Sequence, residues 1–329
     1  MKFQFLIPQY KETDEIVKPL LDSIAIQQNV DFSEIGVIIC NDGTDIRLSE
    51  GLLNSYPFHV EYYMEPHRGV SGTRNACLDH ATADYVMFCD ADDMFFNACG
   101  LYIIFREIDT GGFDSLTSAF IEETRHPVEK VPFYVNHDID STFVHGKVHR
   151  RQYLLDQNIR WNDALTIHED SYFNVLCQKL SQNVKYCPSA FYLWKWRDES
   201  VCRHDPKYIL KTYNNLLDSN TALVEQFLSR QRMEDAQFYV VSMIYDAYFT
   251  MNKNEWIAQE NQEYRRQTEL RFKRYFETFE TLFTTCPNDI RSQLIMGIKN
   301  RMFNEGLLME TQTFDQWITH IQAMSEQDF

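Results

Sequence analysis

The stretch Ala83 to Asp93, A-D-Y-V-M-F-C-D-A-D-D, decides the fold class of this chain. Tyr85 to Cys89 is a run of five apolar residues, three of them β-branched or aromatic, which is typical of a strand covered on both faces. Three carboxylates follow within four positions, those of Asp90, Asp92 and Asp93. Two carboxylates about 5 Å apart repel by roughly 3 kcal/mol at an effective dielectric near 20. The cluster therefore predicts a site at which a cation neutralises the charge.

The carboxylate cluster is expected just beyond the carboxyl end of its strand, where open α/β sheets bind their ligands. The hard oxygen atoms of Asp90 and Asp92 suit Mg²⁺ or Mn²⁺ and leave coordination positions for water and a phosphate. For an isolated D-x-D, a solvated acidic turn that caps a helix is the alternative. The buried strand before it and the segments upstream favour the cation site.

The composition of the 329 residues, 44 % hydrophobic and 24 % charged, is that of an ordinary globular protein. No apolar run approaches membrane-spanning length and no signal-peptide pattern opens the chain, so a cytoplasmic location is expected. The formal net charge of −17 argues against a surface that attracts nucleic acid or anionic membrane non-specifically. The eight cysteines form no C-x-x-C motif, which favours buried free thiols over disulfides or a zinc site.

Strand and helix patterns alternate upstream of the carboxylate cluster. Strands are expected at Lys2–Ile7 (ended by Pro8), Ile35–Cys40 and Phe58–Met64, and helices at Thr13–Gln28, Ile46–Ser55 and Gly69–Ala81. This order predicts a mostly parallel sheet with a nucleotide site at its carboxyl edge. Because neither G-x-G-x-x-G nor a P-loop is present, phosphate is expected to be held by a metal and by arginine.

Seven motifs in order resemble those of family 2 glycosyltransferases. They are I-P-Q-Y-K-E (7–12), C-N-D-G-T (40–44), G-V-S-G-T-R-N-A-C-L (69–78), F-C-D-A-D-D (88–93), H-G-K-V-H-R-R-Q-Y-L (145–154), H-E-D-S-Y-F-N (168–174) and Y-L-W-K-W-R-D-E-S-V (192–201). The resemblance covers about residues 1 to 205. It implies a GT-A fold, Rossmann-like with a mostly parallel sheet, and an inverting transferase that uses a nucleotide-diphosphate sugar, usually a UDP-sugar.

The resemblance also assigns roles to site residues. Asp170 takes the position of the general base, with Glu169 as an orienting group; an N-cap of a helix expected at Ser171–Leu180 is the alternative for Asp170. Mn²⁺ or Mg²⁺ would be bound by Asp92, Asp90 and His204, with Asp93 further out. The donor would be bound by Pro8, Tyr10, Glu12, Asp42, Arg74, Asp90, Ala91, Arg197 and Arg203. Arg68 departs from the family's usual sequence, and it is a donor-binding candidate because its position favours a phosphate contact.

Several of these residues have ordinary structural alternatives. Asp42 is also a typical turn residue before a glycine, Arg74 a typical ion-pair arginine, and a lone histidine such as His204 is more often structural. Lys147 and His145 are candidates for the donor-sugar or acceptor site. Three tryptophans are candidates for stacking on sugar rings or, equally, for the core: Trp161, Trp194 and Trp196.

From Pro206 onward the pattern changes to helical spacing and predicts a bundle of about four to six helices. The expected domains are thus residues 1–205, catalytic, and 206–329, helical, for acceptor binding or oligomerisation. Within the second, Arg265 to Phe276 interleaves basic and aromatic residues. A solvated face balanced by glutamates is favoured there over a docking helix for an anionic acceptor such as a teichoic acid, a phospholipid surface or DNA.

The sequence thus predicts a metal-dependent glycosyltransferase that acts on an acceptor hydroxyl of a glycan, with protein or nucleic acid as less favoured acceptors. Two other classes remain open. A nucleotidyltransferase acting on sugar phosphates places carboxylates similarly, but it usually has a glycine-rich basic loop after the first strand, where this chain has Pro8-Gln9-Tyr10. A non-catalytic carbohydrate-binding scaffold is the other; retention of Asp90, Asp92 and Asp170 together argues against it.

Overall fold

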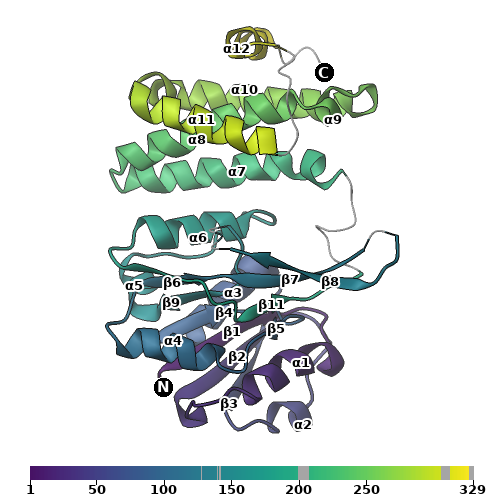
Figure 1. Cartoon of the computed structure of the whole chain (residues 1–329), viewed down its shortest axis with the longest axis vertical. Coiled ribbons are helices and arrows are strands. Elements are labelled where there is room, and N and C mark those ends of the chain that lie inside the picture. Colours follow the sequence, from purple (N-terminus) through teal and green to yellow (C-terminus); the bar gives the residue numbers. More distant parts are fainter. Residues whose placement is uncertain (127, 139, 141, 199–206, 305–311, 326–329) are drawn as a thin grey trace. The chain divides into compact units, whose positions relative to one another are not determined.

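The computed structural model describes the chain except residues 127, 139, 141, 199–206, 305–311 and 326–329 (Figure 1). The chain divides into two compact units, Met1–Ser200 and Val201–Phe329. The domain boundary predicted after residue 205 lies within 199–206, outside the described residues, and the roles predicted for the two domains stay predictions. No helix of the described chain combines the length and the apolar character needed to cross a membrane.

A seven-stranded sheet forms the centre of the first unit and confirms the mostly parallel α/β fold. Its order is β10 (Val184–Cys187), β6 (Ser115–Ser118), β9 (Lys147–Arg150), β4 (Tyr85–Phe88), β1 (Phe3–Gln9), β2 (Ile35–Asp42) and β3 (His59–Glu65). Only β9 runs antiparallel to its neighbours, β4 and β6. The predicted organising strand, β4, therefore lies in the middle of the sheet, and its four residues are all buried.

The first strand continues through Pro8, so the prediction that proline ends it was wrong. Pro8 pairs with Cys40 of β2, and the pairing extends to Gln9. On the other side, pairing with β4 stops at Leu6, whose carbonyl accepts a hydrogen bond from the Cys89 N–H at 3.0 Å. Because alternate residues of a strand face the same neighbour, the Pro8 nitrogen points to the side where β4 has ended. Because no strand of the described residues lies on that side at Pro8, its missing N–H costs the sheet no hydrogen bond.

The core of the first unit follows from the alternation of the strands. Phe3, Phe5 and Ile7 of β1 all belong to one buried cluster, together with the apolar stripe of α1 (Asp14–Ala25). Helix α3 (Gly69–His80) packs against β1 and β2. The remaining helices are α2 (Glu50–Leu53), α4 (Gly100–Asp109), α5 (Arg151–Asp156) and α6 (Glu169–Lys179), with a short 3₁₀ turn η1 at Phe32–Glu34. The helix predicted at Ile46–Ser55 is only the single turn α2.

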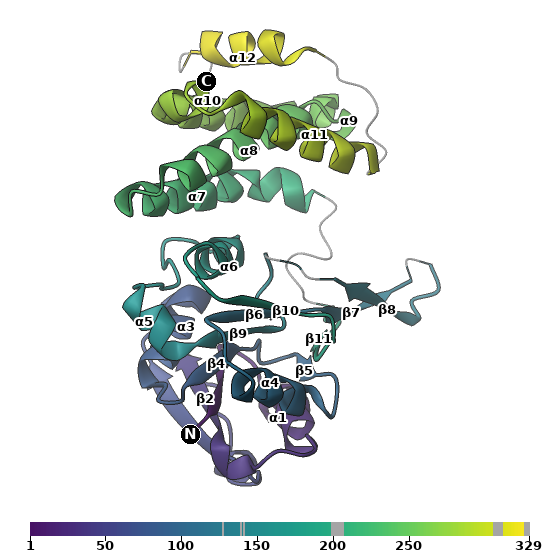
Figure 2. The ribbon, with the colours of Figure 1, turned by 60° about the vertical axis from the view of Figure 1, so that its left-hand side comes forward.

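A second, four-stranded sheet was not predicted from the sequence. Its order is β5 (Met94–Phe95), β11 (Tyr192–Trp194), β7 (Phe120–Arg125) and β8 (Pro132–His137), and Figure 2 shows β7 and β8 as a hairpin that projects from the first unit. Its pairing is antiparallel except between β7 and β11. Apart from the β7–β8 hairpin, these strands are short and far apart in sequence, so local periodicity does not reveal their pairing. The sheet matters because β11 returns to the end of β4.

The second unit is helical, as predicted, and its described part contains α7 (Tyr208–Ser229), α8 (Met233–Met251), α9 (Asn254–Ile257), η2 (Gln259–Asn261), α10 (Gln262–Thr284), α11 (Asn288–Asn304) and α12 (Phe314–Ala323). Helix α8 packs on α7, α10 and α11, and α12 packs on α10. Helix α8 is buried along much of its length, because it is surrounded by the other helices.

We expect Gly43→Ala to destabilise the first unit by about 2 kcal/mol or more, measured as a shift of the urea midpoint. Gly43 follows β2 with φ +70°, and a Cβ there would lie 2.5 Å from the His67 backbone nitrogen. Gly51→Ala is the matched control, since Gly51 is exposed in α2 and has open space. That change should be neutral or stabilising by up to about 1 kcal/mol, and equal effects of the two substitutions would contradict the argument.

Candidate active site

Arg74 of α3 is the centre of the candidate site. Its guanidinium is 3 % exposed and donates to Asp170 at 2.8 Å, to Asp90 at 2.9 Å and to Glu169 at 3.2 Å. Although burial disfavours the charge, the three carboxylates keep the pKa of Arg74 above its ordinary value. The flat face of the guanidinium lies over the Trp161 ring at 4.4 Å. In this structure the Arg74 guanidinium thus forms ion pairs with three carboxylates. This arrangement corresponds to the alternative in which Arg74 is an ion-pair residue.

The end of β4 is fixed by β11. Asp93 is buried, and its carboxylate accepts from the Tyr192 hydroxyl at 2.6 Å and from the Lys195 N–H at 2.9 Å. The same Tyr192 hydroxyl accepts from the Asp90 N–H at 3.1 Å. Burial, Asp92 and Asp90 raise the pKa of Asp93 well above its ordinary range. Asp93 therefore holds the turn that presents Asp90 and Asp92.

Asp92 and Asp90 are the two carboxylates of the cluster that remain partly open, at 26 % and 31 % side-chain exposure. Asp92 accepts from Arg197 at 2.8 Å, and the same Arg197 nitrogen lies 3.4 Å from Glu12. Arg197 follows β11 and Glu12 follows β1, so the structure brings together three residues predicted from separate motifs. Three of the predicted donor-site and metal-site residues, Glu12, Asp92 and Arg197, thus share one edge of the site.

Asp42 ends β2, next to residues of the β3–α3 connection. Its carboxylate accepts from the Arg68 N–H at 2.7 Å and lies 2.9 Å from His67 Nδ1. The His67 ring stacks on Tyr10 with centroids 5.2 Å apart, and both side chains are exposed. This places Tyr10, Asp42 and Arg68 together at the carboxyl ends of β1 and β2. The contribution of Arg68 to the contact is its backbone, not its charged group.

Glu169 and Asp170 begin α6, and His168 is the N-cap residue, with φ +63°. The alternative in which Asp170 caps a helix starting at Ser171 is therefore wrong, because the helix starts two residues earlier. Asp170 accepts from Arg74 and, with its other oxygen, from the Val144 N–H at 3.1 Å. Burial raises the pKa of Asp170, which Arg74 opposes, and burial and Asp170 raise the pKa of Glu169 to about 7.

The loop that supplies Val144 is held from inside. Lys147 is buried and donates to the Phe143 carbonyl, and Asn174 of α6 donates to the Thr142 and Phe143 carbonyls at 3.0 and 2.9 Å. Burial lowers the pKa of Lys147 to about 8. Lys147 was a candidate for lining the sugar site. In this structure it supports the loop that positions Asp170.

The donor set at the end of β4 fits a divalent cation. Ligand atoms of Asp90, Asp93 and His145 lie within 4.8 Å of one another. His145 is enclosed by Tyr192, Phe143, Trp194 and Phe120, which fix its ring. Oxygen atoms dominate this set, and Asp92 is adjacent, so its chemistry suits Mn²⁺ or Mg²⁺. The sequence argument gave the role of histidine ligand to His204. In the structure it is His145 that lies near the carboxylates of Asp90 and Asp93.

The structure places the other predicted residues as follows. Arg203 and His204 lie outside the described residues, so their predicted roles stay predictions. Pro8 lies within β1 at the site edge, and the Ala91 methyl group belongs to the core. Trp161 is buried and stacks on Phe173 at 4.1 Å, which leaves its ring for packing and not for a sugar. Trp194 and Trp196 are both partly buried.

The sequence argument missed Tyr192, Val144 and Asn174. Tyr192 opens the motif Y-L-W-K-W-R, so its position was noted but not its bond to Asp93. An aromatic residue two positions before a buried tryptophan gives no sign of a hydroxyl partner 99 residues earlier. Val144 acts through its backbone N–H, for which no side-chain signal exists.

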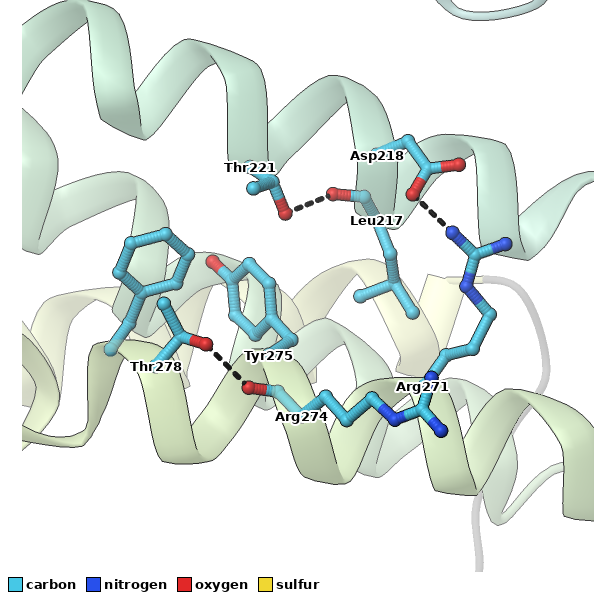
Figure 3. Close-up of a pocket in the computed structure, with 8 residues that line it drawn as sticks. Leu217, Asp218, Thr221, Arg271, Arg274, Tyr275 and Thr278 are labelled. Carbon is cyan, nitrogen blue, oxygen red and sulfur yellow. Dashed lines mark hydrogen bonds and ion pairs between the residues drawn. The ribbon is translucent and has the colours of Figure 1, made fainter.

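The basic-aromatic stretch of α10 has the arrangement of the solvated face that was favoured. Phe272, Tyr275 and Phe276 are buried, while Arg265 pairs with Glu269 at 2.8 Å and Lys273 with Glu277 at 2.7 Å. Arg271 pairs with Asp218 of α7 beside a hollow of about 240 Å³ between α7 and α10 (Figure 3). The pair of Arg271 and Asp218 is exposed, and exposed ion pairs contribute about 0 to 1 kcal/mol each.

Comparison with known proteins identifies the family. Residues 5–167 match the family described as Glycosyl transferase family 2. The chain belongs to this family. All the described motifs up to the loop before α6 fall within the matched region. The Glu169-Asp170 pair and β11 follow it, at the positions that the family resemblance predicted from the sequence.

A relative of this family 2 member is much longer than the chain itself. Over 205 residues the chain is 27 % identical to the Minor teichoic acid biosynthesis protein GgaB of Bacillus subtilis (strain 168), an alignment that covers 56 % of this chain and 21 % of GgaB. The chain thus spans about a fifth of that relative.

Solved structures confirm the GT-A fold. S. aureus TarS 1-349 in complex with UDP superposes with a TM-score of 0.61 at 16 % identity, over 93 % of this chain and 92 % of that chain; TarS 1-349 is also known in complex with UDP-GlcNAc. The mannosyltransferase PcManGT from Pyrobaculum calidifontis, in complex with GDP-Man and Mn²⁺, superposes with a TM-score of 0.50 at 12 % identity, over 97 % and 84 % of the two chains. At these identities the likeness is one of fold.

The pKa of Glu169 predicts a pH dependence of stability. The folded chain holds this proton up to about pH 7, whereas the ordinary pKa is 4.5. The group therefore contributes fully below about pH 4.5, and its contribution is lost as the pH rises to about 7. Between about pH 5 and 7 we expect the unfolding free energy of the wild type to fall by about 1 to 3 kcal/mol more than that of Glu169→Gln.

Urea denaturation at each pH measures this difference. Glu50→Gln, at an exposed position of α2, is the matched control and should behave like the wild type. A Glu169→Gln variant whose stability follows the wild-type pH profile would show that the carboxyl is not held protonated by its buried surroundings.

Proposed function

We propose that this chain is a metal-dependent, inverting glycosyltransferase that moves a sugar from a nucleotide-diphosphate sugar to an acceptor hydroxyl. A UDP-sugar is the proposed donor, and Asp170 is the proposed general base. Family membership supports the reaction class. The complexes of TarS with UDP and UDP-GlcNAc make UDP-GlcNAc the first donor to test.

One observation carries the proposal: Arg74 bonds to Asp90 and Asp170 at once, at 2.9 and 2.8 Å. The carboxylate proposed for the leaving diphosphate and the one proposed for the attacking hydroxyl are thus fixed on the same guanidinium. A displacement at the anomeric carbon needs these two functions on opposite sides of one reacting centre. Arg74 is proposed as the positioning residue that sets their separation, in place of the diphosphate contact predicted from the sequence.

The donor is proposed to lie along the carboxyl ends of β1, β2 and β4. Tyr10 and Asp42 would contact the nucleobase and Pro8 and Glu12 would line that side, with Asp42 held ready by the Arg68 N–H. Arg197 already contacts Asp92 and Glu12, and it would contact the diphosphate by exchanging a carboxylate for a phosphate oxygen.

A divalent cation, Mn²⁺ or Mg²⁺, is proposed at Asp90 and Asp92, with Asp93 and His145 behind them. When bound, such an ion acts as a Lewis acid that stabilises charge on the departing diphosphate. PcManGT, which shares the fold, is known with Mn²⁺ bound. Around the ion, Tyr192 keeps the turn of Asp90 in place, and Asp93 satisfies the Lys195 N–H.

In the proposed reaction, Asp170 takes the proton of the acceptor hydroxyl as its oxygen forms a bond to the anomeric carbon. The bond from that carbon to the phosphate oxygen breaks, and its electron pair stays with the nucleotide diphosphate. Asp170 has capacity for this proton, because each carboxylate oxygen accepts only one protein hydrogen bond here. Burial raises the pKa of Asp170 and so favours proton uptake, while Arg74 opposes that rise.

We expect Asp170→Asn to keep donor binding and to lose turnover, because only the proton acceptor is removed. Release of UDP from UDP-GlcNAc should fall by about 100-fold or more.

Asp92→Ala should instead abolish the rise in melting temperature that UDP-GlcNAc produces with Mn²⁺ and that EDTA removes. At about 100 times the dissociation constant, that rise should be several degrees in the wild type.

Asp79→Asn is the matched control for both variants, since Asp79 is an exposed partner of Arg160 away from the site. It should retain both donor binding and turnover. Equal donor affinity in the wild type and Asp92→Ala would overturn the metal assignment, and full turnover by Asp170→Asn would overturn the base. If no nucleotide-diphosphate sugar shifts the melting temperature, the transferase proposal itself fails.

A further inference from the structure

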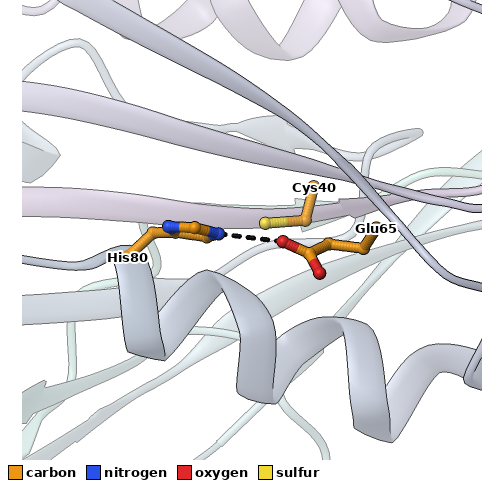
Figure 4. A group of neighbouring side chains, drawn as sticks. All are labelled: Cys40, Glu65 and His80. Atoms are coloured by element: carbon orange, nitrogen blue, oxygen red, sulfur yellow. Dashed lines mark hydrogen bonds and ion pairs between the residues drawn. The ribbon is translucent and has the colours of Figure 1, made fainter.

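A second group of metal-ligating side chains lies outside the candidate active site. Cys40 of β2, Glu65 at the end of β3 and His80 at the end of α3 point toward one another (Figure 4). One ligand atom from each lies within 4.8 Å of the others, and His80 Nε2 is 2.9 Å from Glu65 Oε1. We propose that Cys40, Glu65 and His80 bind a zinc ion.

The ligand set favours zinc over the ions proposed for the active site. Zinc binds thiolate, imidazole and carboxylate together, at about 2.3, 2.0 and 2.0 to 2.2 Å respectively. Mg²⁺ and Mn²⁺ prefer all-oxygen surroundings, which a cysteine does not provide. One thiolate and one carboxylate also balance the two positive charges of zinc, and a neutral imidazole adds none.

The spacing fits a tetrahedral ion. Bonds of the lengths given above put neighbouring ligand atoms about 3.3 to 3.8 Å apart. The observed distances, 2.9 Å for the pair from His80 to Glu65 and at most 4.8 Å for the others, bracket that range. Small movements of side chains would thus accommodate the ion, with no change of the backbone.

The surroundings hold the ligands in place. Tyr63 stacks on the His80 ring with centroids 3.6 Å apart and planes 3° from parallel, and its hydroxyl donates to Glu61 at 2.6 Å. Such outer contacts orient metal ligands. Cys40 and Cys77 are both buried, and burial together with the Cys40 thiol raises the pKa of Cys77. The Cys77 thiol donates to the Ile7 carbonyl at 3.6 Å and is not one of the three clustered ligands.

The location gives the ion a structural role. Cys40 precedes Asp42 by two residues in β2, and Asp42 is the register partner of Glu65 in β3. A zinc ion here would join β2, β3 and α3 at the corner where Arg68 and His67 contact the Asp42 carboxylate. The cysteine spacing argued against a zinc site because no C-x-x-C is present, but a site assembled from three elements needs no such motif.

The test uses the full chain, purified without chelators, with zinc measured by mass spectrometry. We expect about one zinc per chain. After removal with a strong chelator, Zn²⁺ should raise the melting temperature by several degrees, and Co²⁺ in its place should give a thiolate-to-cobalt absorption band in the near ultraviolet. The Asp90, Asp93 and His145 group has no sulfur, so the band reports only on the proposed zinc site.

Cys40→Ser should remove the cobalt band and the zinc-dependent shift. His80→Gln, at a partly exposed position, should weaken zinc binding by about 100-fold or more and serves if Cys40→Ser does not fold. Cys187→Ser, at a buried cysteine elsewhere, and Asp92→Ala should keep both signals, which separates this site from the proposed active site. A wild-type chain without zinc and without the band overturns the proposal, as does a band that persists in Cys40→Ser.

Discussion

The candidate active site depends on the ion pairs of three carboxylates with one buried guanidinium. Arg74 carries one positive charge against Asp90, Glu169 and Asp170, so the group keeps an excess of negative charge in a place of low exposure. Such an excess is costly unless protons or cations reduce it. The raised pKa of Glu169 shows the first response, and the open sides of Asp90 and Asp92 allow the second.

The same interaction couples segments that are far apart in the chain. Arg74 links α3 to the start of α6, almost a hundred residues later, and to the end of β4. Tyr192 and Lys195 tie that end of β4 to β11 from a similar distance. The site is therefore held together by contacts between segments that are distant in the sequence. A substitution at Arg74 acts on three carboxylates at once, and one at Tyr192 acts on the Asp93 carboxylate and the Asp90 N–H, which is why we assign them positioning roles.

The two proposed metal sites lie at different places beside one sheet and differ in their ligands. At the end of β4 the donors are mainly oxygen atoms that are partly open, as suits an ion that exchanges with substrate phosphates. At the corner of β2, β3 and α3 a buried thiol, an imidazole and a carboxylate converge, as suits an ion that stays. Asp42, for which we propose a contact to the nucleobase, accepts from the Arg68 N–H and lies against His67 at that corner.

The sequence by itself determined the order of the strands and helices that lead to the end of β4. The five apolar residues before Asp90 specified a buried central strand, and the alternation before them specified a parallel sheet with its polar residues at the carboxyl edge, because periodicity and strand direction are local properties. The motifs indicated the family and singled out Asp42, Asp90, Asp92 and Asp170, whose roles stay proposals. Even the helical second unit followed from spacing alone.

Only the tertiary structure decided which of these residues meet. The three partners of Arg74, the hydroxyl of Tyr192 on Asp93, the second sheet and the group of Cys40, Glu65 and His80 all join positions that are distant in sequence. Contacts of this kind depend on how the helices and strands pack. The identity of a residue, such as arginine, does not reveal whether its side chain is buried or exposed. The physical reason is that burial and distance, which set charge, pKa and ligand geometry, are properties of the packed chain and not of its local pattern.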